Sequence, residues 1–180
     1  LIQVPDKGEL ETFLRYLPLL PHAEDFKESA VEALRTNIAT VFDAIALDNP
    51  YPAAHFNDQQ WNQMYLKAAF MQRDLTRIQD VDKRANADLT RIISDYAHER
   101  WAASRDVDPQ FWRPVSNFIQ GALIKDMEKL LESTNNAENR AGALCCYRSE
   151  NETGKALLSD YPELMKQVAD GTITWENLNN

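Results

Sequence analysis

The amino-acid sequence predicts an all-α protein. Apolar residues recur three and four positions apart along most of the chain, and no run alternates apolar and polar residues as a half-buried strand does. The chain has only five glycines, which also favours helices. Its 180 residues are enough for one domain with a substantial core. We therefore predict a single helical domain over residues 1–180, with longer helices in 1–133 and short stacked helices in 134–180.

Three helices are predicted in the first part of the chain. Residues 7–20 have helical apolar spacing that two prolines end, and one long apolar stripe predicts a second helix over 23–47. Asn57 or Asp58 caps a third helix that reaches about Arg73. Apolar side chains cover more than half of this third helix, so we expect it to be central in the fold. A charged connector with one short helical turn follows.

The best-delimited helix is predicted over residues 87–104. Asn86 is a suitable N-cap, because its side-chain oxygen can accept a hydrogen bond from an early helical N–H. Asp108-Pro109 then opens another helix that continues to Leu131 with a kink, since Pro114 and Gly121 fall inside it.

Short helices are predicted in the last part of the chain. One covers residues 136–148, a second follows a capping box formed by Ser149 and Glu152, and a third opens at Pro162 and ends at Gly171. Short helices joined by tight turns predict a right-handed α-α superhelix resembling the stacked hairpins of HEAT and armadillo proteins. No internal sequence period supports a true repeat array.

The helix at 87–104 also holds the candidate functional residues. Its polar face carries Asp88, Arg91, Asp95, His98 and Glu99. Arg100 instead falls within the apolar arc, where an unpaired charge is very costly, so we predict that Arg100 forms a buried structural ion pair. The helix therefore either anchors an ion-pair network or lines a polar cleft.

Asp95, His98 and Glu99 are weak candidates for acid–base catalysis. Neighbouring carboxylates can raise each other's pKa, and histidine titrates near neutral pH. An ordinary solvated helix face contains the same residue types, and we favour that interpretation. Asp95 and His98 also have the spacing of a metal-binding pair, but the chain has three histidines and no second copy of the motif, so no metal site is predicted.

Aromatic residues give a second kind of candidate site. Trp101 lies at the border between the apolar and polar faces, where it could form the wall of a pocket for a flat ligand, although such residues are more often part of the core. We predict that a groove for a ligand or partner would be lined by six residues: Arg84, Arg91, Asp95, His98, Glu99 and Trp101.

Composition excludes several classes of function. The net charge of −9 and the absence of a basic patch argue against nucleic-acid binding. No apolar run is long enough to span a membrane. The adjacent Cys145 and Cys146 are expected to be buried, reduced thiols, which favours the cytoplasm. No P-loop, dinucleotide fingerprint, nucleophile elbow or zinc-protease motif occurs, so no cofactor is predicted.

Several stretches of the chain resemble the EboA-domain family. The similar segments read FDAIALDNPYP (42–52), WNQMYLKAAF (61–70), DKRANADLTRIISDYAHERWAA (82–103), FWRPVSNFI (111–119) and ENRAGALCCYRS (138–149). The DYAHERWAA block is the most specific of them. The chain departs from the family pattern at Ala87, where a proline is expected, and in a more charged connector before it.

The resemblance implies a setting rather than a reaction. Proteins of this family are encoded beside a UbiA-type prenyltransferase, in clusters associated with moving secondary-metabolite precursors from cytoplasm to periplasm, as for the pigment scytonemin. No catalytic residues carry over. We therefore expect a cytoplasmic, non-enzymatic accessory protein that binds another Ebo-cluster protein or a small aromatic or prenylated metabolite. The alternative is a small enzyme that uses Asp95, His98 and Glu99, with Arg100 or Arg84 orienting an anionic group.

Overall fold

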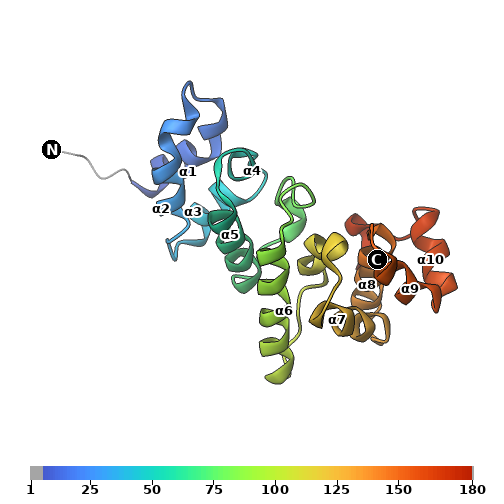
Figure 1. The fold of residues 1–180 in the computed structure, drawn as a ribbon. Helices are drawn as coiled ribbons and strands as arrows, with labels where there is room; N and C mark the ends of the chain where they lie inside the picture. The colour runs from blue at the N-terminus through green and yellow to red at the C-terminus, as the bar shows by residue number, and fades with distance from the viewer. Residues whose placement is uncertain (1–5, 180) are drawn as a thin grey trace. The chain divides into compact units, whose positions relative to one another are not determined.

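All secondary structure in the described part of the chain is helical, as predicted (Figure 1). The computed structural model describes residues 6–179. The α-helices are α1 (Lys7–Tyr16), α2 (Lys27–Ala33), α3 (Ala39–Ala46), α4 (Tyr51–His55), α5 (Asp58–Phe70), α6 (Ala87–Ala102), α7 (Ala122–Leu131), α8 (Asn136–Arg148), α9 (Glu152–Ser159) and α10 (Pro162–Ala169). The 3₁₀ helices are η1 (Leu17–Leu19), η2 (Ala23–Phe26), η3 (Leu75–Arg77), η4 (Pro109–Phe118) and η5 (Trp175–Asn177).

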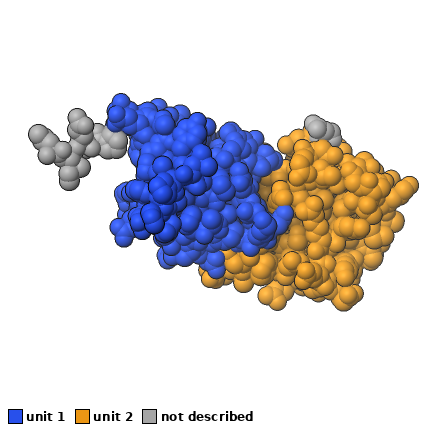
Figure 2. Space-filling model, turned by 90° about the horizontal axis from the view of Figure 1, so that it is seen from above, with its two compact units in different colours: residues 1–84 blue, residues 85–180 orange. Residues whose placement is uncertain are grey.

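The chain divides into two compact units, which Figure 2 colours separately. Unit 1 comprises residues 1–84 and unit 2 comprises residues 85–180. Each unit has its own set of fully buried large side chains, including Trp61 in unit 1 and Trp112 in unit 2. The prediction that residues 1–180 form a single domain stays a prediction, and its two ends lie outside the described residues.

In unit 1, α5 begins where the sequence predicts. Asn57 Oδ1 accepts from Gln60 N at 2.9 Å, and Gln60 Oε1 accepts from Asn57 N at 3.0 Å, so the two residues form a capping box. Trp61 and Tyr65 of this helix are at most 1% exposed. The predicted helix at 7–20 is shorter than expected: α1 ends at Tyr16, and the chain continues as the 3₁₀ turn η1.

The predicted continuous helix over 23–47 is wrong. The chain forms η2 and α2, leaves the helix after Ala33, and starts α3 at Ala39. Thr36 Oγ1 accepts from Ile38 N at 3.0 Å, a local bond that competes with helical ones. Lys67 Nζ of α5 also donates to the carbonyl oxygens of Leu34, at 2.5 Å, and Thr36, at 2.7 Å. The break is therefore stabilised by a cation that lies far away in the sequence.

In unit 2, α6 starts as predicted, with Asn86 Oδ1 accepting from Leu89 N at 2.9 Å. α8 packs against η4, α7, α9 and α10, so it forms the centre of this unit. Its buried residues are mostly small, with Leu144 the exception, and both cysteines are reduced and fully buried, as expected. A Cβ added at Gly142 would lie 2.9 Å from Leu130 Cβ, which shows how closely α8 approaches α7.

The predicted kinked helix over 109–131 is two separate elements. η4 is a 3₁₀ helix throughout, and Pro114 inside it lacks the N–H that an α-helical bond requires. Gly121, at φ 58°, then redirects the chain into α7. A smaller correction concerns α9, whose N-cap is Asn151, accepting from Gly154 N at 2.9 Å, rather than Ser149.

Candidate functional site

A buried carboxylate of α7 holds two polar side chains of α6. The side chain of Asp126 is 2% exposed. Ser94 Oγ donates to Asp126 Oδ2 at 2.6 Å, and His98 Nε2 lies 2.6 Å from Asp126 Oδ1. Because an ionised carboxylate can only accept, this geometry places the Nε2 proton of His98 toward Asp126. Ser94 and His98 are one helical turn apart, so a single carboxylate fixes both.

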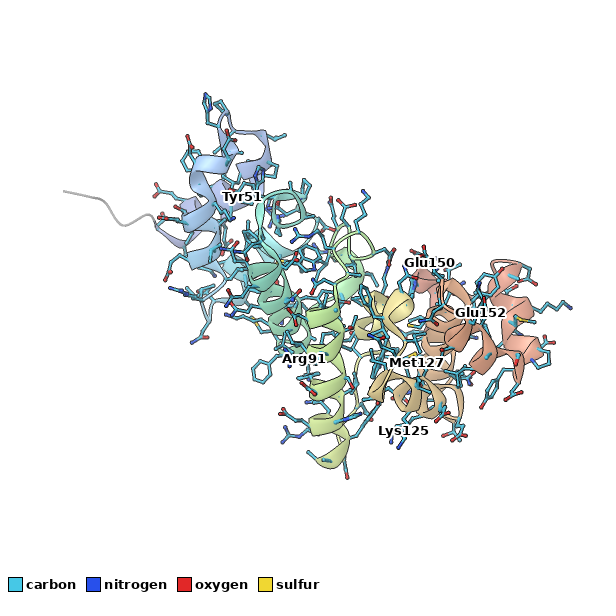
Figure 3. All side chains as sticks on the ribbon, viewed as in Figure 1. Tyr51, Arg91, Lys125, Met127, Glu150 and Glu152 are labelled. Carbon is cyan, nitrogen blue, oxygen red and sulfur yellow. The ribbon has the colours of Figure 1, made fainter. Side chains whose placement is uncertain are left out.

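The sequence-based prediction did not include Asp126 among the site residues. It lies within the apolar stripe of α7, whose buried members Leu123, Met127 and Leu130 stand three, one and four residues away. A charge inside an apolar stripe needs a polar partner. Arg100 lies within an apolar arc in the same way, so the same pattern of a charge among apolar residues could have identified Asp126. Figure 3 labels Met127 and Lys125, the two neighbours of Asp126 on α7.

Trp101 lies next to this polar cluster. Its ring is stacked on that of the fully buried Trp112, with centroids 5.7 Å apart and planes 21° apart. The His98 ring lies 5.7 Å from it, and Lys129 Nζ of α7 lies 4.6 Å from its centroid. Trp101 itself is partly exposed. We call the four residues His98, Trp101, Lys129 and Asp126 the α6–α7 site.

Within residues 6–179, no hydrogen bond or ion pair joins Asp95, His98 and Glu99, which were predicted as a cluster. Asp95 Oδ2 pairs with Arg91 Nη1 at 3.4 Å, and both side chains are about two-thirds exposed (66% and 65%). Glu99 is exposed, while His98 is engaged by Asp126. Arg91, labelled in Figure 3, also approaches Asp88 at 3.9 Å. These charges form a solvated helix face, which is the interpretation that the sequence favoured.

Arg84 has an architectural position in unit 1. Its guanidinium donates to the carbonyl oxygens of Pro52, Ala53 and Phe56 at 3.2, 2.7 and 2.9 Å. It also lies over the Trp61 ring, 5.0 Å from the centroid. The residue therefore adds a donor to the Pro52 carbonyl, which also accepts from Phe56 N, and supplies donors to the Ala53 and Phe56 carbonyls around the end of α4.

The prediction for Arg100 is corrected. Its Nε and Nη2 donate to the backbone carbonyl oxygen of Asp106 at 3.0 and 2.8 Å, and the guanidinium lies 6.0 Å from the Tyr96 ring centroid. The side chain is partly buried, and its partner is a carbonyl rather than a carboxylate. Arg100 thus holds the turn after α6, and it forms no ion pair with any residue between 6 and 179, because the chain returns over the end of the helix.

Within residues 6–179, no group of three or more His, Cys, Asp or Glu side chains is arranged to hold a metal ion. In the same range, no helix is both long enough and apolar enough to cross a membrane. A surface hollow of about 660 Å³ lies in unit 1, among residues of α1, α2 and α3. None of the residues predicted to line a groove contributes to that hollow.

Comparison with known proteins identifies a family. The model of a family described as metabolite traffic protein EboA matches residues 1–116. No curated protein and no solved structure matches the chain. The matched segment includes His98, Trp101 and Trp112, whereas Asp126 and Lys129 lie beyond it. The α6–α7 site therefore joins residues from inside and outside the matched segment.

Proposed function

The chain belongs to the EboA family, and from this we propose that it is a non-enzymatic accessory protein of metabolite traffic. It binds an aromatic precursor of a secondary metabolite on the cytoplasmic side and assists the export of that precursor to the periplasm. Other Ebo-cluster proteins would deliver or receive the ligand. The HEAT-like superhelical arrangement of the helices stays part of this proposal.

The observation that carries the proposal is the position of Trp101. A partly exposed indole is held in a fixed orientation by the buried Trp112 beneath it. Aromatic surfaces of this kind bind flat ligands by offset stacking, which contributes about 0.5–1.5 kcal/mol per ring pair beyond burial. Lys129 has a flexible aliphatic stem, so a ligand ring can displace its ammonium group from the indole.

The surrounding residues make the position of Trp101 rigid. Asp126 fixes His98, and His98 packs beside the indole ring. Rigid presentation of a ring lowers the entropy lost on binding. The polar groups at its edge would set the orientation of the ligand, as in other small-molecule sites.

The proposal is tested by native mass spectrometry of the protein purified from cells in which its gene is native. We expect a bound small molecule of aromatic absorbance that Trp101→Ala loses. Tyr147→Ala is the matched control, because Tyr147 is 43% exposed and lies on α8, away from the site. Absence of a ligand from the wild-type protein, or equal retention by Trp101→Ala, would contradict the proposal.

A second candidate function, that of a small enzyme, is favoured by one contact. A buried carboxylate 2.6 Å from a half-exposed imidazole, 51% exposed, is the arrangement that orients a histidine for proton transfer. Ser94 is not a nucleophile in this arrangement, because its hydroxyl donates to Asp126 rather than to His98. In this candidate, Asp126 is the carboxylate that acts with His98 in acid–base catalysis, in place of Asp95 and Glu99.

His98→Asn and Asp126→Asn test the enzymatic candidate. If His98 transfers a proton, both variants stop turnover of the pathway intermediate while the protein still binds it. If both variants fold and sustain normal pathway output, the enzymatic candidate is eliminated and the binding function stands.

A further inference from the structure

We infer that the ligand of the α6–α7 site is an aromatic anion: a flat ring system that carries a carboxylate or a phosphate group. This inference rests on the proposed function and specifies the chemical class of the ligand. The observations behind it are the positively charged ammonium groups of Lys129, over Trp101, and Lys125, one turn before it. The chain as a whole has a net charge of −9.

The first positive group is Lys129. Its Nζ lies 4.6 Å from the Trp101 centroid, where it makes a cation–π contact. No carboxylate within residues 6–179 lies at ion-pair distance from this ammonium. When a ligand ring covers the indole, Lys129 is displaced to the edge of that ring, and there it can bind an anionic substituent.

The second positive group is Lys125, which precedes Lys129 by one turn of α7 and is also exposed (Figure 3). Residues four apart share a helix face, so the two ammonium groups can reach the same substituent. Like charges at this spacing repel, and a bound anion relieves that repulsion. In the described part of the chain, Lys125 likewise has no carboxylate at ion-pair distance.

Within residues 6–179, no acidic residue of α7 forms an ion pair with Lys125 or Lys129. Burial, followed by the charges of Glu132, Asp160 and Glu128, raises the pKa of Tyr161, just before α10. Glu128 and Glu132 therefore act electrostatically on Tyr161, although each also lies three residues after a lysine on the exposed face of α7. Asp126 is occupied by Ser94 and His98. Lys129 thus presents an ammonium group at Trp101, and Lys125 lies one helical turn before it on α7.

Selective quenching of Trp101 fluorescence tests the charge of this surface without any ligand. Trp61, Trp112 and Trp175 are at most 1% exposed, so iodide and caesium ions in solution report on Trp101. Each quenching constant is divided by that of free N-acetyltryptophanamide, because iodide quenches indole more efficiently than caesium does at equal access. We expect the normalised iodide constant to exceed the normalised caesium constant about twofold, in spite of the negative net charge. The double variant Lys125→Gln/Lys129→Gln should remove this preference. Lys155→Gln, which removes a lysine of α9 paired with Glu152, should keep it.

The chemistry of the ligand is tested with two pairs of probes. Indole-3-carboxylate is compared with the neutral indole-3-carboxamide, and phenyl phosphate with phenol, at low salt. We expect one anion to bind at least about fivefold more tightly than its neutral analogue, and the double lysine variant to lose that difference. The pair that shows the difference identifies the carboxylate or the phosphate.

Two results would overturn the inference: a normalised iodide quenching constant no larger than the normalised caesium constant, or no preference for either anionic probe. Failure of the proposed function is a different result. In that case wild-type protein from native cells carries no small molecule, whatever the quenchers report. If a bound aromatic molecule is found and is neutral, the proposed function stands and the inference fails.

Discussion

His98 Nε2 lies 2.6 Å from Asp126 Oδ1, and this contact joins α6 to α7. It places a half-exposed imidazole on a carboxylate that is 2% exposed. The same carboxylate accepts from Ser94 through its other oxygen. The carboxylate therefore organises the side of α6 on which Trp101 presents its ring.

Asp126→Ala should destabilise unit 2. The substitution leaves the buried Ser94 hydroxyl without its acceptor and releases His98, so we expect the free energy of unfolding to fall by about 2 kcal/mol. Chemical denaturation measures the change. Asp95→Ala is the matched control on an exposed carboxylate and should alter stability by less than about 0.5 kcal/mol. Equal effects of the two variants would show that Asp126 has no structural role.

Arg84→Ala should destabilise unit 1 by about 2–3 kcal/mol. The carbonyl groups of Pro52, Ala53 and Phe56 each lose the bond from Arg84, although Pro52 keeps its bond from Phe56 N. Trp61 also loses its cation–π contact. Arg84→Lys should recover little, because an ammonium group cannot reproduce the planar fork of donors. Arg35→Ala removes an exposed pair with Glu32 and serves as the control. Full rescue of stability by Arg84→Lys would contradict a requirement for the planar guanidinium group.

The pH dependence of stability should reveal Cys146. Burial raises the pKa of its thiol from 9.0 to about 12. The unfolded chain then loses this proton at lower pH than the folded chain. The contribution of Cys146 to stability is therefore complete below pH 9 and is lost progressively between pH 9 and about 12, at up to about 1.4 kcal/mol per pH unit. Cys146→Ala should show a shallower decline over that interval. An unchanged slope would contradict burial of the thiol.

Gly142→Ala should destabilise the protein even though alanine is the better helix former. The added Cβ would lie 2.9 Å from Leu130 Cβ and 3.3 Å from the backbone nitrogen of Leu131. Relief of this overlap pushes α7 and α8 apart, which costs about 1–3 kcal/mol. Gly8→Ala in α1 meets only Asp6 Oδ1 at 3.4 Å and should be neutral or slightly stabilising. A stabilising effect at Gly142 would contradict the close packing of the two helices.

Local signals predicted much of the fold. Asn57 and Asn86 cap α5 and α6 as expected, because a cap depends on residues three positions apart. The continuous helix at 23–47 was wrong because Lys67, about thirty residues away, stabilises the exposed carbonyl groups at the break. The apolar stripe over residues 23–47 could not indicate that Lys67, a residue outside it, would donate to these carbonyl groups.

The candidate site was predicted only in part. His98 and Trp101 were recognised from their places on the 87–104 helix, but their partners Asp126 and Lys129 come from another helix. The pairing of α6 with α7 depends on the 3₁₀ path of η4 and on the turn at Gly121. The sequence indicated neither the length nor the direction of that connection, so Asp95 and Glu99 were grouped with His98 instead.

The central claim is that Trp101 marks the surface on which a metabolite binds. The most direct measurement is the NMR signal of the four tryptophan indole N–H groups while a small-molecule extract of the native cells is added. We predict that the Trp101 signal shifts in a saturable manner and that the Trp61 and Trp175 signals stay in place. A stationary Trp101 signal, in the presence of an extract that supports the pathway, would contradict the claim.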